Sequence, residues 1–264
     1  MSHLNYTRRV PSSPWRKVSI GSWKPTGDSS IHAFEEFNVE PALAWCAEKK
    51  ISFNTFLLKI IGQTISEKDT INRVIRFGKV YQRATIRIFY HVLPSKQTDD
   101  LSGALIDQPH LRSADELEVD LRQQINAIRR GNDPMKASKK TFARLPGIAA
   151  RPMLNVLSFL LYSLNIKPFF VPAPNDPFGS VMVTHIGSFG LTKACTPIAP
   201  YTRIPMVIAV GKTEKRVISE NDEVVQREMA TLGFTFDHRI MDGIQFSEFI
   251  QVLTHYFSHP YELK

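Results

Sequence analysis

The sequence predicts an α/β fold, a mixed sheet packed with helices, and three observations predict it. Short apolar runs that end in glycine, at 180–187 and 204–211, have the length of buried strands. Longer segments repeat apolar residues at helical spacing. A hydrophobic fraction of 43%, with 17 phenylalanines, can fill a sizeable core. The length of 264 residues allows one large domain or two, and since no internal repeat or Pro/Ala-rich linker divides the chain, we predict a single domain over 1–264.

The predicted elements of the first part of the chain alternate between strand and helix. Residues 31–39 are a predicted strand, and 40–50 are a short helix with Pro41 in its first turn. The segment 52–66 is a predicted core helix, because its apolar residues recur every three to four positions. Enrichment in Thr, Ile, Val and aromatic residues predicts two strands, at 74–82 and 84–93.

The later elements carry clearer start and stop signals. Ser113 and Glu116 have the spacing of a capping box, which starts a helix that we predict to reach residue 130. Residues 145–166 have helical propensity that is interrupted near Pro146 and Pro152. We predict a hairpin over 216–236 with its turn near Asn221 and Asp222, and a last helix over 244–257 with one apolar face.

The charge balance favours an anionic partner. A net charge of +8 and a pI of about 9.5 suit nucleic acid, an anionic membrane or a phosphate-bearing cofactor. A solvated basic surface explains the same numbers equally well. Because no zinc-finger, RRM or KH pattern accompanies the basic residues, we do not expect nucleic acid as a partner.

Cysteine usage and hydropathy bear on the compartment. Cys46 and Cys195 are far apart in sequence and form no CxxC pair, which favours a reducing, cytoplasmic setting. The N-terminus has no apolar signal core. The longest charge-free stretch, 152–166, falls short of the roughly 20 residues that span a bilayer, so we predict no membrane span.

The stretch "FTFDHRIMDG", residues 234–243, contains the candidate chemistry. A strand-like run ends in Asp237, His238 and Arg239, and Asp242 and Gly243 follow where a helix begins. Imidazole is the natural base near neutral pH, because its ordinary pKa is about 6.5. The spacing alone is a weak motif and favours a surface histidine beside a carboxylate that stabilises the helix dipole.

The same stretch resembles the DHRxxDG signature of the dihydrolipoamide acyltransferases, the transacylase cores of 2-oxo acid dehydrogenase complexes and relatives of the chloramphenicol acetyltransferases. Three further segments are similar to the family: "VTHIGSFGLTKACTPIAP", the run from "PMVIAVG" through the hairpin, and the closing "SHPYELK". Near the N-terminus, "PWRKVSI" resembles the family's arginine-rich opening. The resemblance implies a chloramphenicol acetyltransferase-like two-layer sandwich with a mixed sheet.

The resemblance also implies a thioester transacylase and a set of site residues. His238 would take the proton from a thiol, and the Thr184 hydroxyl would stabilise the oxyanion. Asp242 would hold the site loop through an arginine, for which Arg16 is the best match, with Arg8 and Arg9 as alternatives. Gly243 would relieve crowding at the turn. The sequence offers no metal-ligand spacing, and the residues that bind the cofactor stay unassigned.

The implied assembly is a homotrimer with each site between two subunits, and a higher cage is an open alternative. The sequence shows no lipoyl domain and no peripheral-subunit-binding domain, so we expect a stand-alone catalytic domain that uses coenzyme A as substrate, with any lipoyl carrier on another polypeptide. Two rival interpretations stay open: a non-catalytic scaffold core, and an O-acetyltransferase of a small hydroxylated molecule. The apolar segment 152–170 is either an extra core or trimer-contact helix or the lining of a channel for a longer acyl chain.

Overall fold

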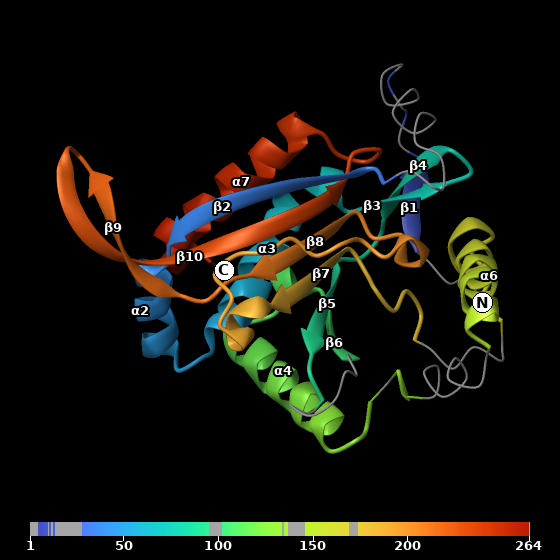
Figure 1. The fold of residues 1–264 in the computed structure, drawn as a ribbon, viewed down its shortest axis with the longest axis horizontal. Coiled ribbons are helices and arrows are strands. Elements are labelled where there is room, and N and C mark those ends of the chain that lie inside the picture. Colours follow the sequence, from blue (N-terminus) through green and yellow to red (C-terminus); the bar gives the residue numbers. More distant parts are fainter. Residues whose placement is uncertain are drawn as a thin grey trace.

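A mixed, seven-stranded sheet forms the centre of the molecule (Figure 1). The computed structural model describes residues 5–9, 11, 13, 28–94, 102–133, 135, 136, 146–168 and 174–263. The strand order is β2-β10-β8-β7-β5-β6, with β9 paired to β10. The strands are β2 (Ser30–Asn38), β5 (Arg87–Val92), β6 (Ser102–Asp107), β7 (Val181–His185), β8 (Met206–Val210), β9 (Glu214–Glu220) and β10 (Glu223–Asp237). Parallel pairing joins β5 to β7 and β7 to β8, and all other pairs are antiparallel.

One face of this sheet is closed by helices. They are α2 (Glu40–Lys49), α3 (Phe53–Glu67), α4 (Ala114–Arg129) and α7 (Gly243–Ser258). Their apolar faces pack with alternate strand residues into the main core, whose centre includes Phe56, Phe234, Phe249 and Phe257, none more than 1% exposed. The capping box predicted for α4 is confirmed, because the Ser113 hydroxyl and the Glu116 side chain each bond the other residue's backbone N–H.

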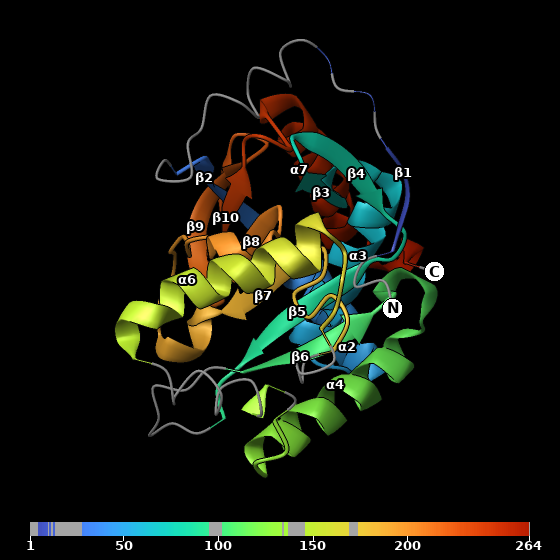
Figure 2. The same ribbon diagram turned by 90° about the vertical axis from the view of Figure 1, so that its right-hand side faces the viewer.

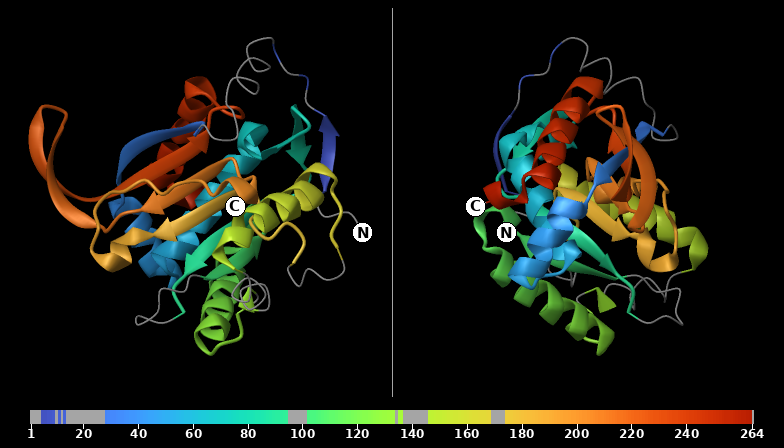
Figure 3. Two further views of the ribbon diagram at one scale, coloured as in Figure 1. Left: turned by 45° about the vertical axis from the view of Figure 1, so that its right-hand side comes forward. Right: turned by 90° about the vertical axis from the view of Figure 1, so that its left-hand side faces the viewer.

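A different helix lies over the other face. Helix α6 (Gly147–Ser158) stands on the side of the sheet away from α2, α4 and α7 (Figures 2 and 3). Pro152 lies inside α6, so the expected interruption does not end the helix there, and Pro146 is its N-cap residue. The chain then widens into a π-helical turn, Phe159–Ser163. The part of the apolar segment that the structure describes, 152–168, is therefore mainly this helix and turn.

The prediction of one continuous strand over 74–82 is wrong. Two short strands, β3 (Arg73–Arg76) and β4 (Lys79–Arg83), form a hairpin instead. Phe77 and Gly78 make its turn with φ of 48° and 68°. With β1 (Tyr6–Arg9) this hairpin forms a small sheet of order β1-β4-β3. The predicted hairpin of β9 and β10 is confirmed, and both Asn221 and Asp222 have the positive φ that such a turn requires.

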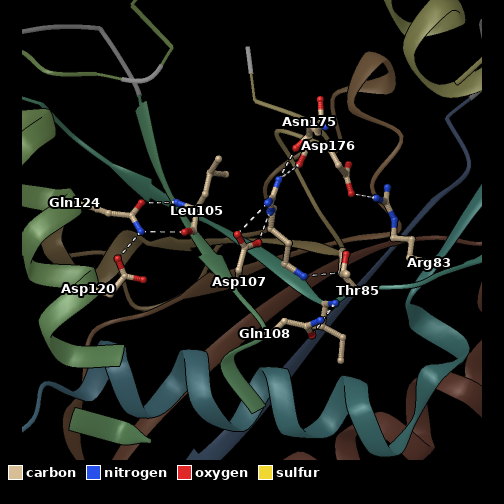
Figure 4. Close-up of polar contacts among 12 residues, drawn as sticks. Arg83, Thr85, Leu105, Asp107, Gln108, Asp120, Gln124, Asn175 and Asp176 are labelled. Carbon is tan, nitrogen blue, oxygen red and sulfur yellow. Dashed lines mark hydrogen bonds and ion pairs between the residues drawn. The ribbon is translucent and has the colours of Figure 1, made fainter. Parts of the chain in front are cut away.

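The edge of the large sheet at β6 is capped by a side chain (Figure 4). The amide of Gln124 in α4 bonds both the backbone N–H and the C=O of Leu105, at 2.8 and 2.9 Å. It therefore blocks pairing groups that an edge strand otherwise leaves open. Gln124 also donates to Asp120 on its own helix. These bonds hold α4 against the end of the sheet where the candidate site lies.

Candidate active site

The turn after β10 is held by one buried carboxylate. Asp237 is 6% exposed and accepts hydrogen bonds from the Ser29 hydroxyl at 3.0 Å and from the Arg239 backbone N–H at 3.0 Å. The Arg239 guanidinium adds a fork of bonds, the shortest at 2.7 Å from Nη2. This bonding to Asp237 raises the pKa of Arg239. The geometry of "DHR" therefore follows from a charge-assisted pair within the motif itself.

Two hydrogen bonds fix His238, one from its backbone and one from its ring. Its N–H donates to the carbonyl of Ser29 at 2.9 Å, which ties the turn to the start of β2. Its Nδ1 lies 3.3 Å from the carbonyl oxygen of Met241. Since a carbonyl only accepts, Nδ1 carries the proton and Nε2 is the basic nitrogen. The turn thus selects the tautomer that a general base needs.

Asp242 is the N-cap residue of α7. It accepts from the backbone N–H of Ile244 at 3.2 Å, and its own N–H donates to Gln245 Oε1 at 3.0 Å, which completes a capping box. Asp242 therefore acts as the helix-start carboxylate that the sequence spacing also allowed. A Cβ at Gly243 would meet no described atom within 4 Å, and its φ is not positive, so the described chain shows no crowding there. Arg16 lies outside the described residues, and Arg8 is exposed in β1.

Thr184 lies at the other end of the sheet, near the carboxyl end of β7. The register of β7 and β8 places it opposite Ala209, whereas Phe236 of β10 lies opposite Met206. His238 is two residues beyond Phe236. At about 3.3 Å per residue, Thr184 and His238 are separated by roughly 16 Å along the strands, and by two strand spacings of about 4.8 Å across them. A single chain therefore does not bring these two side chains together.

Beside Thr184 stands a histidine that the sequence analysis did not select. The parallel register of β5 and β7 pairs Tyr90 with Val183, so His91 and Thr184 are the next neighbours. The His91 ring meets Phe89 edge-on at 5.0 Å. Burial lowers the pKa of His91 to about 4, so the ring is neutral at pH 7. Its Nδ1 is buried and has no hydrogen-bond partner within the described part of the chain.

Two hollows meet at His91 and Thr184, and both residues line each of them. The first hollow, of about 790 Å³, lies at the carboxyl ends of β5 and β7. We call it the polar hollow because Asn54, Tyr90, Arg129 and His185 line it, together with apolar residues such as Val92, Ile125 and Phe189. The apolar pocket, of about 620 Å³, lies on the sheet face under α6 and is also lined by Phe89, Leu154, Phe178, Met182, Ala199 and Val207. Substrate sites favour the carboxyl ends of parallel strands, so this pair of hollows is the natural place for a ligand.

The sequence offered little that singled out His91. Its position in a predicted strand, two residues after Phe89, predicts that both side chains lie on the same face of the sheet. Only the parallel pairing of β5 with β7 shows that His91 lies beside Thr184. Among the described residues, no group of three or more His, Cys, Asp or Glu side chains gathers to hold a metal ion. No helix in the described ranges is both long enough and apolar enough to cross a membrane.

A protein-family model matches the last third of the chain. Residues 177–264, which contain Thr184 and the whole His238 turn, match the 2-oxoacid dehydrogenases acyltransferase (catalytic domain). No curated protein sequence matches the chain.

Solved structures match almost the whole chain at low identity. A probable dihydrolipoamide acetyltransferase from Listeria monocytogenes 4b F2365 is 17% identical, with a TM-score of 0.62 over 96% of this chain and 95% of its own. The cubic core of a pyruvate dehydrogenase multienzyme complex is 12% identical, with a TM-score of 0.67 over 97% and 93%. A chloramphenicol acetyltransferase is 13% identical, with a TM-score of 0.58 over 95% and 99%. These likenesses confirm the predicted fold class.

Proposed function

We propose that the chain, whose residues 177–264 match the family model of the 2-oxoacid dehydrogenases acyltransferase (catalytic domain), is an acyltransferase that moves an acyl group between a thioester and a thiol. The proposal depends most on the His238 turn, in which Asp237 accepts from the backbone N–H of Arg239 and the Met241 carbonyl accepts a hydrogen bond from Nδ1 of His238. Coenzyme A is the proposed donor or acceptor of the acyl group.

The proposed chemistry starts with the acceptor thiol. His238 Nε2 takes the thiol proton, and the thiolate attacks the carbonyl carbon of the thioester. The new C–S bond turns the carbonyl oxygen into an oxyanion, which the Thr184 hydroxyl stabilises by donating a hydrogen bond. The tetrahedral intermediate then expels the donor thiolate, which takes the proton back from His238. The reaction therefore ends with the acyl group moved and the enzyme unchanged.

The two catalytic groups come from different subunits in this proposal. Within one chain His238 and Thr184 lie near opposite ends of the sheet, as the strand register gives. A homotrimer, in which the turn of one subunit meets β7 of the next, supplies both. A larger cage built from such trimers is compatible with the same site. Asp242 then supports the loop from the start of α7, with Arg16 as its proposed partner.

The remaining proposals concern the setting. Any lipoyl carrier is proposed to reside on another polypeptide, and the chain itself is proposed to be one catalytic domain. Cys46 and Cys195 are both free thiols, which suits a cytoplasmic setting. A non-catalytic scaffold would have no need for the hydrogen bond that keeps Nε2 of His238 as the basic nitrogen. The O-acetyltransferase alternative uses the same base on a hydroxyl, and replacing the dithiol acceptor of the test below with a small alcohol decides between the two.

The first test is thioester exchange by the purified protein. With acetyl-CoA and a dithiol acceptor, we expect His238→Ala to lower kcat by about 100- to 10,000-fold, the range for loss of a general base. The matched control is His259→Ala, which removes an exposed histidine after α7 and should leave kcat unchanged. Equal rates in the His238→Ala variant and the wild type would refute the proposed mechanism.

A second test addresses the shared site. Co-expressed His238→Ala and Thr184→Val chains form mixed trimers, in which some interfaces pair an intact His238 with an intact Thr184. We expect these mixtures to exceed the activity of either variant alone, and the solution mass to be that of a trimer or a multiple of it. A fully active monomer, or no gain on mixing, would contradict the shared site.

A further inference from the structure

We propose that the apolar pocket binds the acyl chain of the thioester, and that the preferred chain is medium-length or branched and not acetyl. This inference rests on the proposed acyl transfer and adds its substrate class. The pocket begins at Thr184, the proposed oxyanion donor, so a chain that leaves the thioester carbonyl enters it directly. An acetyl group would fill only a small part of the 620 Å³, whereas a longer hydrocarbon chain could cover more of the apolar lining.

The lining of the pocket is mainly apolar, and its polar groups include those of Thr184, Thr196 and His91. Phe89, Met182 and Val207 are each no more than 7% exposed and form the floor on the sheet. Leu154 of α6 and Ala199 line the opposite side. These side chains offer methyl, methylene and aromatic contacts, which favour a hydrocarbon chain over a polar one.

The pocket is also held in shape before any ligand arrives. Phe178 follows a loop that is anchored by the Arg83–Asp176 ion pair and by a bond from Arg87 to the carbonyl of Asp176 at 3.1 Å (Figure 4). The Phe89 ring occupies the space over Gly103, where a Cβ would lie 2.1 Å from it. Preformed walls lower the ordering cost of binding, so the pocket can hold a flexible chain.

The polar hollow suits the other half of the same substrate. Asn54 Oδ1 is buried without a partner in the described ranges, and Arg129 supplies a positive charge. A thiol arm with amide and phosphate groups, such as that of coenzyme A, matches both features. Because burial keeps His91 neutral, the junction of the two hollows does not place a charge next to the hydrocarbon.

The test compares binding and transfer for acetyl-, butyryl-, isovaleryl-, octanoyl- and dodecanoyl-CoA. Octanoyl has six CH₂ groups more than acetyl, and full burial of each would strengthen binding by roughly fourfold. With partial burial, worth roughly twofold per CH₂ group, we expect octanoyl-CoA to bind about 100-fold more tightly than acetyl-CoA. Calorimetry on the His238→Ala protein measures this preference without turnover. Leu154→Trp fills the pocket and should lower the octanoyl-to-acetyl ratio about 10-fold. Val156→Trp, on the exposed side of α6 at 57% exposure, is the matched control and should keep the ratio.

A second variant guards against misfolding of α6. Ala199→Phe narrows the pocket from the loop side and should lower the same ratio. If all chain lengths bind and react equally, and both variants keep that pattern, the inference is wrong while the acyl-transfer proposal stands. If no donor is turned over but the binding preference persists and responds to Leu154→Trp, acyl transfer fails and the pocket assignment stands.

Discussion

The turn that carries His238 and the strand ends that carry Thr184 differ in how completely their polar groups are paired. At the turn, Asp237 accepts bonds from Ser29 and Arg239, and the His238 ring donates to a carbonyl. Around Thr184, three buried atoms have no partner in the described ranges: His91 Nδ1, Thr196 Oγ1 and Asn54 Oδ1. All three residues line the polar hollow or the apolar pocket.

The difference is the one expected if the turn is completed by its own chain and the strand ends bind a ligand, as the proposed function requires. An unpaired buried polar atom costs about 1–3 kcal/mol, so several in one place need a functional reason. In the proposed mechanism, the paired turn holds the base in position, and the unpaired strand ends receive the ligand. Changes at the turn should therefore reduce stability together with activity, whereas changes at the strand ends should reduce activity alone.

After the loss predicted above for His238→Ala, the next largest expected effect is at Thr184. Thr184→Val keeps the β-branched shape but removes the hydroxyl, so we expect kcat to fall about 100- to 1,000-fold, as when an oxyanion donor is lost. The melting temperature should stay within about 1 °C of wild type, because surface-accessible changes without lost packing are nearly neutral. Thr184→Ser, which restores the hydroxyl, should recover most of the activity. Equal loss in the Ser and Val variants would show that the hydroxyl is not the important group.

The next effect is at Asp237. Asp237→Asn places an amide N–H against the Arg239 guanidinium, and we expect about 2–3 kcal/mol less free energy of unfolding, with a parallel loss of activity. Urea denaturation measures the stability. Asp222→Asn in the exposed turn of the β9–β10 hairpin is the matched control, since Asn tolerates the same positive φ. An Asp237→Asn protein with wild-type stability would contradict the claim that the paired groups of the turn stabilise the fold.

The sequence predicted most of the elements whose signals are local. Ser113 and Glu116 predict the start of the helix at 114–129, and Asn221 and Asp222 predict the turn of the hairpin at 214–237. The break between β3 and β4 was missed because its turn begins with Phe77, a residue that strand patterns favour and that positive φ disfavours. Strand β6 was also missed, since "SGALID" is short and becomes a strand by pairing with β5.

The candidate site also has a local part that the sequence predicted and a non-local part that it did not. The His238 turn lies within ten consecutive residues, so its motif was readable and its bonds are mostly internal. His91 becomes relevant only through a parallel pairing with a strand about ninety residues later in the chain, which no local pattern encodes. The apolar pocket likewise combines residues of β5, α6, β7 and β8. Non-local pairing is thus what limited the prediction from sequence.

A smaller effect is expected from the titration of His91. Its pKa in the folded protein is about 4, below the value of about 6.5 in an unfolded chain, so the unfolded state binds more protons between these values. Stability therefore falls as the pH drops through this window, by about 2 kcal/mol at pH 5. His91→Leu should remove that part of the pH dependence between pH 7 and pH 5. Burial also lowers the pKa of His185, which adds the same slope to both proteins. An unchanged slope in His91→Leu would mean that the ring is solvated.

The smallest effect is expected at Ser29, and it tests how redundant the paired turn is. Its hydroxyl gives Asp237 one of several bonds, so Ser29→Ala should cost about 1 kcal/mol in free energy of unfolding. The carbonyl of Ser29 still accepts from the His238 N–H, so kcat should fall less than about twofold, unlike the loss at Asp237. Ser29→Thr keeps the hydroxyl and should match wild type in urea denaturation. A large loss of activity in Ser29→Ala would mean that the turn depends on this one bond, and that its stability does not come from the Arg239 fork.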